Sequence, residues 1–275
     1  MDLKIDKNTF DGIIYAAAGY SDNVYTAMLP EIRNSEAALD NILMRKGMAA
    51  LNENESLLTA CREHVCTTAF LNRLRHFDLI LTDAGFGVVS NDNTAPASRE
   101  RVNALEAQLK RKREESYCSI LRQLVKVPGW GLYPTVRRYF PTLLWDIKEA
   151  EEMTGNKDLT AEDWGKLKSK LFDAAFKIEG FTGNTFLEDL IKASITGDLT
   201  PVKVEAMTRV KKTMVMIVNH PEEKTVIHEA IRRLLSWLDF FRTSFPSYSF
   251  SKEYAARHAE TYENKQESPV YFFGS

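Results

Sequence analysis

The stretch TDAGFGVVSNDNTAPAS, residues 82–98, separates two long segments of helical periodicity. It holds two glycines, a proline and several Asn and Asp residues, which favour turns and loops. Phe86, Val88 and Val89 favour extended structure instead. We therefore predict a short strand or hairpin near residues 84–91, followed by a loop, projecting between two long helices.

The sequence on both sides of this stretch predicts helices. Apolar residues recur with a helical period over residues 55–81, and again from the expected N-cap Ser98 to about Lys126. Caps, prolines and glycines predict further helices at 9–19, 35–48, 134–154, 160–180, 185–196, 201–219, 220–243 and 251–265. Their expected N-terminal signals are Thr9, Ser35, Thr160, a Thr185/Glu188 capping box, Thr200-Pro201, His220-Pro221 and Ser251. The predicted fold class is mainly α, a multi-helix bundle with a short extended or β-hairpin excursion near residues 84–91.

The composition is that of a folded protein. The 275 residues include 36 Lys plus Arg and 38 Asp plus Glu, a formal net charge of −2, and 44% are hydrophobic. These values exclude a disordered, collagen-like or disulfide-framework chain. No apolar run approaches the roughly 20 residues that span a bilayer. The start, MDLKIDKNTF, lacks the features of a signal peptide, so we expect synthesis in a cytoplasm.

The best candidate for a domain boundary is the turn at residues 154–160, which contains Gly155 and Asn156. It would divide the chain into an N-terminal helical region, 1–154, which carries the projecting 82–98 loop, and a C-terminal helical region, 155–275. A single domain is the alternative.

The cysteines and histidines do not form a recognisable metal motif. Cys61 and Cys66 are five residues apart on a predicted helix, with His64 between them, and Cys118 is distant in sequence. No fourth ligand stands at a zinc-site spacing. Small buried thiols on an apolar face are the better interpretation. We expect no metal and no cofactor.

Catalytic motifs are equally scarce. Gly85-Phe86-Gly87 follows a helix and lacks the third glycine of a dinucleotide fingerprint. No G-x-S-x-G element occurs. The carboxylate pairs Glu151-Glu152 and Glu222-Glu223 are adjacent, so they face different directions on a helix. An enzyme is therefore disfavoured, and we assign no catalytic residue.

A basic run, Lys110-Arg111-Lys112-Arg113, is the strongest local charge feature. On a helix these side chains point around the whole axis. One interpretation is a solvated helix with i,i+4 pairs, such as Glu106 with Lys110. The alternative is contact with DNA or an acidic partner.

Two clusters of aromatic residues each allow two interpretations. The first comprises Trp130, Tyr133, Tyr139, Phe140 and Trp145, interleaved with Arg137 and Arg138. It predicts core or interface packing rather than stacking on single-stranded nucleic acid. The second is the C-terminal Tyr271-Phe272-Phe273, which would be costly to leave in water. It either folds back on its own domain or docks on a neighbouring subunit, where it could add a strand.

The segment LTDAGFGVVSNDNTAPASRERV, residues 81–102, resembles the signature of an uncharacterised family found in Bacteroides phages and prophages. In that family a GFGVVS element is followed by APAS and a long charged helix, and the similarity is close over about residues 82–105. The preceding helix and the aromatic-ended tail also resemble the family.

The resemblance implies a virion structural protein of the head–tail connector, or adaptor, class. Such a protein would lie in the neck of the virion, as a homo-oligomeric ring, expected to be dodecameric, that binds the portal protein and tail or neck proteins. Contact with packaged DNA would be possible through Lys110, Arg111, Lys112 and Arg113; no membrane is involved. The interaction residues would be Gly85, Phe86, Gly87, Val88, Val89, Tyr271, Phe272 and Phe273. A nucleic-acid-binding accessory or packaging and assembly protein of a prophage is the alternative.

Overall fold

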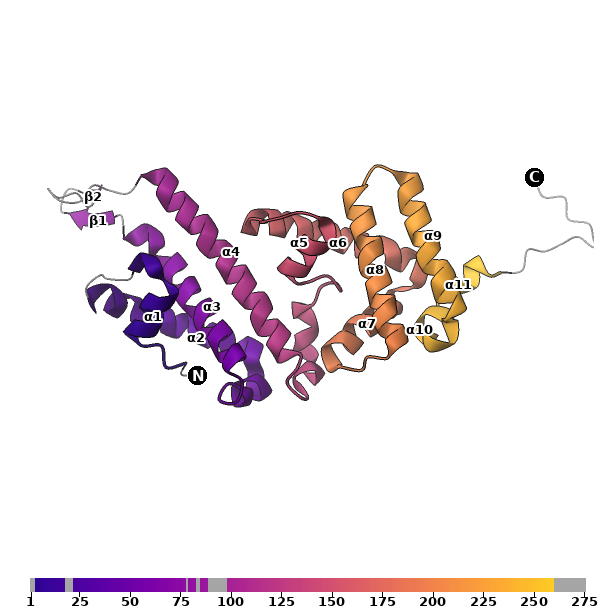
Figure 1. The fold of residues 1–275 in the computed structure, drawn as a ribbon, viewed down its shortest axis with the longest axis horizontal. Helices are drawn as coiled ribbons and strands as arrows, with labels where there is room; N and C mark the ends of the chain where they lie inside the picture. Colours follow the sequence, from indigo (N-terminus) through magenta and orange to yellow (C-terminus); the bar gives the residue numbers. More distant parts are fainter. Residues whose placement is uncertain (1–2, 18–21, 78, 83–84, 89–97, 260–275) are drawn as a thin grey trace, which may run out of the picture.

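A computed structural model describes residues 3–17, 22–77, 79–82, 85–88 and 98–259. Figure 1 shows an elongated chain, with one group of helices at each end and a connecting region between them. The first group contains α1 (Lys7–Ile13), η1 (Tyr15–Ala17), α2 (Asp22–Ala50), α3 (Glu55–Arg73), η2 (Leu74–His76), β1 (Leu79–Thr82), β2 (Gly85–Val88) and α4 (Arg99–Leu124). The connecting region contains η3 (Trp130–Leu132), η4 (Pro134–Tyr139) and α5 (Ile147–Thr154).

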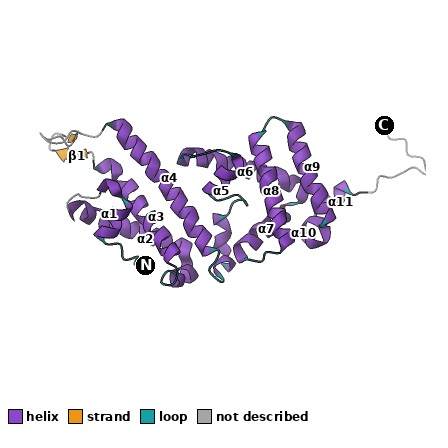
Figure 2. Cartoon of the chain, viewed as in Figure 1, coloured by secondary structure: helices purple, strands orange, loops and turns teal. Residues whose placement is uncertain are grey.

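The second group contains α6 (Ala161–Thr182), α7 (Asn184–Thr196), α8 (Pro201–Asn219), α9 (Lys224–Phe240), η5 (Arg242–Ser244), α10 (Pro246–Ser249) and α11 (Lys252–Arg257). Helices dominate the described residues (Figure 2), so the prediction of a mainly α fold is confirmed. None of the described helices combines the length and apolarity needed to cross a bilayer.

The first group is held together by α3, which packs against both α2 and α4. The Asn54 side chain begins α3 by accepting the Leu57 N–H at 2.9 Å. One face of the helix then buries Cys61, Val65 and Phe70 in the core. The predicted helix at 55–81 is therefore correct for its first part only, because β1 begins at Leu79.

The chain between α3 and α4 includes two short strands. β1 and β2 pair antiparallel, with Leu79 opposite Val88 and Thr82 opposite Gly85. Figure 1 places them at the outer end of the molecule, beyond the end of α4 where Ser98 caps the helix.

The connecting region joins the two groups through buried aromatic packing. The Trp130 indole donates a hydrogen bond to the Ile42 carbonyl of α2 at 3.0 Å. The Phe140 ring lies 6.3 Å from the ring of Trp130 and 4.9 Å from that of Trp145, edge-on to both. On the other side, η3 packs against α7. The core interpretation of this aromatic group therefore agrees with the structure.

Four of the predicted N-caps are confirmed. Ser98, Thr160, Thr200 and Ser251 each accept the backbone N–H of the third residue along the chain, at the starts of α4, α6, α8 and α11. Gly155 ends α5 in a left-handed conformation, which confirms the predicted turn. The division of the chain into two domains at residues 154–160 stays a prediction.

The other predicted N-terminal signals do not cap helices in the structure, although α7 begins at Asn184, within one residue of the predicted start at 185. Asp6, rather than Thr9, caps α1, and it does so by accepting the Thr9 N–H. Ser35 is buried within α2, which begins thirteen residues earlier, at Asp22. The backbone of Gly183 precedes α7 without a capping side chain, and α9 begins at Lys224 rather than after His220.

The predicted helix at 134–154 is also wrong in its first half. Residues 134–139 form a 3-10 helix, and the α-helix begins only after Asp146, whose side chain accepts the N–H groups of Lys148 and Glu149. Pro141 lies in the interruption, where its missing N–H cannot continue a helix.

Candidate interaction surfaces

The predicted anchor residues Gly85, Phe86, Gly87 and Val88 together form strand β2. The backbone of Phe86 pairs with Leu81, and that of Gly87 pairs with Ile80. Val89 and the three tail aromatics, Tyr271, Phe272 and Phe273, lie outside the described residues. The structure therefore unites four of the eight predicted interaction residues at one end of the molecule.

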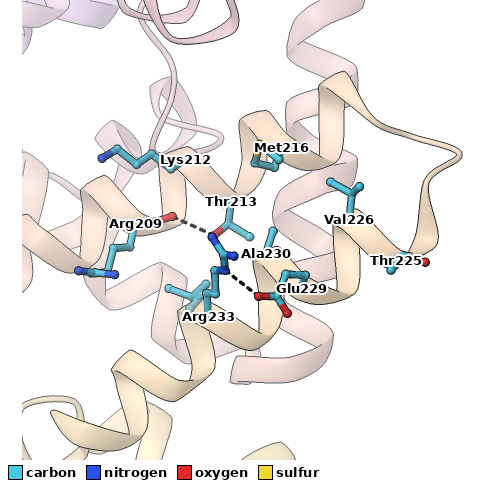
Figure 3. Close-up of a pocket in the computed structure, with 10 residues that line it drawn as sticks. Arg209, Lys212, Thr213, Met216, Thr225, Val226, Glu229, Ala230 and Arg233 are labelled. Atoms are coloured by element: carbon cyan, nitrogen blue, oxygen red, sulfur yellow. Dashed lines mark hydrogen bonds and ion pairs between the residues drawn. The ribbon is translucent and has the colours of Figure 1, made fainter.

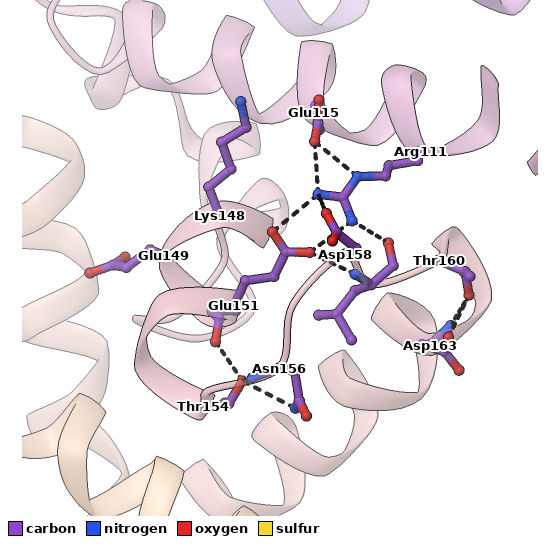
Figure 4. A network of polar contacts seen from close by, with 12 residues as sticks. Arg111, Glu115, Lys148, Glu149, Glu151, Thr154, Asn156, Asp158, Thr160 and Asp163 are labelled. Carbon is purple, nitrogen blue, oxygen red and sulfur yellow. Dashed lines mark hydrogen bonds and ion pairs between the residues drawn. The ribbon is translucent and has the colours of Figure 1, made fainter. Parts of the chain in front are cut away.

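The basic run lies on α4, and Figure 4 shows the polar network around one of its members, Arg111. The guanidinium donates to both carboxylate oxygens of Glu151 on α5, at 2.8 and 3.2 Å. It also donates to the Leu159 carbonyl at 2.8 Å and to Glu115 at 3.1 Å. One side chain thus ties α4 to α5 and to the turn that follows it.

The carboxylate of Glu151 has a lowered pKa for a specific reason. Burial alone would raise the pKa of Glu151, but hydrogen bonds from Arg111 and from the Leu159 N–H outweigh this effect. The hydrogen bond from Arg111 to Glu151 in turn raises the pKa of that guanidinium. The pair is therefore ionised at neutral pH.

Each of the remaining three cations of the run has a polar partner of its own. Lys110 pairs with Glu106 at 2.7 Å, which confirms the predicted i,i+4 pair. The Lys112 ammonium donates to the Ile13 carbonyl at 3.1 Å, and this hydrogen bond links α4 to the C-terminal end of α1. Arg113 lies 3.8 Å from the neighbouring Glu114. Arg111 and Lys112 hold the fold, whereas Lys110 and Arg113 make pairs within their own helix.

The thiols and the central histidine are buried groups. Cys61, Cys66 and Cys118 are all free and buried, and burial raises the pKa of each thiol to about 12. His64 Nδ1 lies 3.2 Å from the Arg113 carbonyl and from Ser116 Oγ, and burial lowers the pKa of this imidazole to about 4. The thiols are protonated and unreactive at neutral pH. In the described ranges, no set of three or more His, Cys, Asp and Glu side chains is placed to hold a metal ion.

A groove of about 480 Å³ lies between α8 and α9 (Figure 3). Its floor is mostly apolar and includes Met216 from α8 and Val226, Ala230 and Leu234 from α9. Thr213 also lines it, but its hydroxyl donates to the Arg209 carbonyl at 2.9 Å and so presents its methyl side to neighbours. An apolar segment would fit this arrangement.

Charged residues lie around this groove. Arg209, Lys212 and Arg233 contribute positive charge, and Glu229 is the carboxylate among the lining residues. Hydrogen bonds from Arg232 and Arg233 lower the pKa of Glu229 to about 2, so it is ionised. The Arg209 guanidinium lies 5.0 Å from the centre of the Trp237 ring, a cation–π contact. The lining of the groove carries a net positive charge.

The groove is not evident from the sequence alone. One indication of the groove is present in the sequence of α9. Val226 and Ala230 widen the apolar face of this helix and are only partly buried. The core buries the neighbouring residues Ile227, Ile231 and Leu234. The matching residues of α8 come from a separate helix, so no single window of sequence contains the site.

Several large aromatic side chains are exposed on the second group. Phe172 and Phe176 are one turn apart on α6 and are 56% and 70% exposed. Phe240, at the end of α9, is 79% exposed and packs edge-on against Phe241 at 4.8 Å. Such side chains are compatible with contact surfaces for other proteins.

Comparison with known proteins gives one family. A model described as a family of unknown function (DUF6712) matches residues 29–130. This range includes most of α2, all of α3, β1, β2 and α4, and ends at the beginning of η3. No curated protein and no solved structure matches the chain. The match covers the segment at residues 82–105 and provides no activity for it.

Proposed function

We propose that the chain is a structural protein of a phage virion, a head–tail connector that forms a ring in the neck between the portal and the tail. The single observation that carries this proposal is the placement of unlike surfaces at opposite ends of an elongated helical body. Strands β1 and β2 lie at one end, and the α8–α9 groove belongs to the helices of the other end (Figure 1).

A ring requires this kind of asymmetry. Copies related by rotation about a ring axis meet through heterologous interfaces, in which one surface contacts a different surface on the next copy. The extended excursion predicted near residues 84–91 would supply one such surface. Within it, Phe86, Val88 and Val89 would be the apolar anchors, and Gly85 and Gly87 would allow close backbone approach. The portal and the tail proteins are the proposed neighbours, with the neck of the virion as the location.

Quantitative mass spectrometry of gradient-purified virions tests the proposal directly. The particles should come from the phage that carries this gene. A connector is expected at a low, fixed copy number relative to the capsid protein, consistent with a ring, and is located by cryo-electron microscopy of the portal region. Absence of the protein from purified particles would end the connector proposal.

A double variant tests the proposed anchors. Phe86→Asp with Val88→Asp places two charges on β2, and we expect a helical and soluble protein that fails to support particle assembly. Leu132→Asp is the matched control, because Leu132 is 72% exposed and lies in η3, away from β2. Circular dichroism verifies folding of both variants. Normal particle yield with the double variant would contradict the assignment of these anchors.

A further inference from the structure

The groove between α8 and α9 leaves apolar surface uncovered in the described chain. Met216 on its wall is 38% exposed, and Val226 and Ala230 are only partly buried. Covering apolar surface removes it from water and is therefore favourable. The chain itself contains a segment of suitable composition, because Val270, Tyr271, Phe272 and Phe273 follow one another near its C-terminal end.

The charges of the groove and of this segment are opposite. The lining of the groove includes Arg209, Lys212 and Arg233 against the one carboxylate of Glu229. Residues 260–275 contain three glutamates, Glu260, Glu263 and Glu267, against one lysine, Lys265. Complementary charge of this kind favours the correct pairing of two surfaces over others.

The described end of the chain lies within reach of the groove. His258 Nε2 is 3.7 Å from Asp239 Oδ2, so residue 258 lies beside the C-terminal end of α9. The helix rises about 21 Å from Asp239 back to Thr225, at about 1.5 Å per residue. Residues 260–275, at about 3.3 Å per residue when extended, can cover about 53 Å. The segment is therefore long enough to follow α9 along the whole groove of its own molecule.

We propose that the C-terminal segment, residues 268–275, binds in the α8–α9 groove of the same chain. Tyr271, Phe272 and Phe273 lie against the apolar floor, and the glutamates that precede them lie near the arginines of the rim. The short tether favours the molecule's own segment over that of a second copy, because it holds the segment at a millimolar effective concentration. This binding is independent of the connector proposal.

Disulfide trapping tests the proposal in the full-length chain. Thr225 is an exposed lining residue of the groove, so a Thr225→Cys, Tyr271→Cys variant should form an intramolecular disulfide under mild oxidation. The three native thiols are buried and do not compete. The matched control is His228→Cys with Tyr271→Cys, because His228 is exposed on the same turn of α9 but does not line the groove.

We expect the groove pair to oxidise about tenfold faster than the control pair, since docking raises the local concentration of the two thiols. Non-reducing gels and peptide mapping identify the linked residues. Equal rates for the two variants would overturn the proposal, as would a groove pair that yields only intermolecular dimers.

Hydrogen exchange provides a second measurement that needs no new cysteine. Phe272→Asp with Phe273→Asp changes only the segment and no residue of the described core. We expect faster amide exchange across residues 224–234 of α9 in this variant than in the parent chain, and the same difference at tenfold dilution. Unchanged exchange, or a difference that disappears on dilution, would count against binding within one molecule.

Discussion

Arg111 shows how a residue with the appearance of a ligand-binding group serves the fold. Its side chain is partly buried, and it has three hydrogen-bond partners: the carboxylates of Glu151 and Glu115, and the carbonyl of Leu159. Removal of such a group leaves a poorly hydrated carboxylate without its counter-charge, and this loss dominates the cost.

Arg111→Ala should therefore lower the free energy of unfolding by about 2 kcal/mol, as measured by chemical denaturation at pH 7. The matched control is Arg232→Ala, since Arg232 pairs with Glu229 at 2.8 Å on the surface and its side chain is 70% exposed. We expect that variant to lose much less stability than Arg111→Ala, because solvent screens an exposed ion pair. Equal losses in the two variants would show that the Arg111 network contributes no more than a surface pair.

His64 makes stability depend on pH. Its pKa of about 4 in the folded chain lies below the ordinary value of about 6.5, so the unfolded chain binds more protons between these values. The contribution of His64 to the free energy of unfolding is therefore fully present above about pH 6.5, and it is lost as the pH decreases toward 4. Between pH 7 and pH 5 the free energy of unfolding should drop by about 2 kcal/mol from this residue alone.

His64→Gln should remove most of this loss, whatever its effect on stability at pH 7. Denaturant titrations at pH 5, 6 and 7 measure how the free energy of unfolding changes with pH. His228→Gln, at an exposed position of α9, is the control and should keep the slope of the parent chain. A parent chain with equal stability at pH 5 and pH 7 would be incompatible with a buried neutral His64.

At the scale of elements, the contact of η3 with α7 depends on a missing side chain. A Cβ at Gly131 would lie 2.3 Å from the Ile195 carbonyl oxygen, so any larger residue must separate the two elements. Gly131→Ala should lower the free energy of unfolding by about 2 kcal/mol through this overpacking. Gly180→Ala should instead raise it by about 0.5–1 kcal/mol, because a Cβ there meets nothing within 4 Å and alanine favours the helix.

Thermal denaturation of the Gly131→Ala and Gly180→Ala variants compares their unfolding midpoints with that of the parent chain. The expected shifts of the midpoint have opposite signs, which separates the packing effect from the general effect of an added methyl group. A stabilised Gly131→Ala variant would mean that η3 and α7 can move apart at little cost.

Helix starts illustrate what local sequence can predict. Ser98, Thr160, Thr200 and Ser251 were predictable because a capping hydroxyl and the N–H that it satisfies lie three residues apart. Thr185 was not, because its hydroxyl donates to the Ser247 carbonyl while Glu188 pairs with Arg137. Both partners are more than 45 residues away, so tertiary contacts replaced the capping box.

At the scale of the whole molecule, candidate sites that depend on residues far apart in sequence could not be predicted either. The family-like segment around Gly85 is continuous in sequence and could be singled out there. The α8–α9 groove exists only when two helices pack, so its apolar lining could not be separated from ordinary core residues in advance. The pairing of Lys110 with Glu106 was predictable, whereas the long-range role of Arg111 was not.

The proposed contact of the basic run with DNA depends on the charge of the whole chain. With a net charge of −2 the chain has no general attraction for nucleic acid, so any binding must be local. Lys110→Gln with Arg113→Gln neutralises two cations and leaves Arg111 and Lys112 to hold the fold. If the run touches DNA, the slope of log affinity against log salt should decrease by about 2.

Fluorescence anisotropy with duplex DNA between 50 and 200 mM salt, roughly the range over which such contacts weaken by orders of magnitude, measures this slope. Lys166→Gln with Arg232→Gln is the control, since both residues are exposed and lie on α6 and α9. An unchanged slope in the Lys110/Arg113 variant would place any DNA contact elsewhere.

The hydrogen bond from Trp130 to Ile42 also has a kinetic consequence. It joins residues 88 positions apart, whereas α8 and α9 are joined through the short turn after Asn219. The chain entropy lost on closing a loop grows with the length of the loop. Pairing of α8 with α9 therefore has a smaller entropic barrier than the contact of Trp130 with Ile42. During refolding the α8–α9 pair should form early, and the indole of Trp130 should reach its buried position late, when the two groups of helices join.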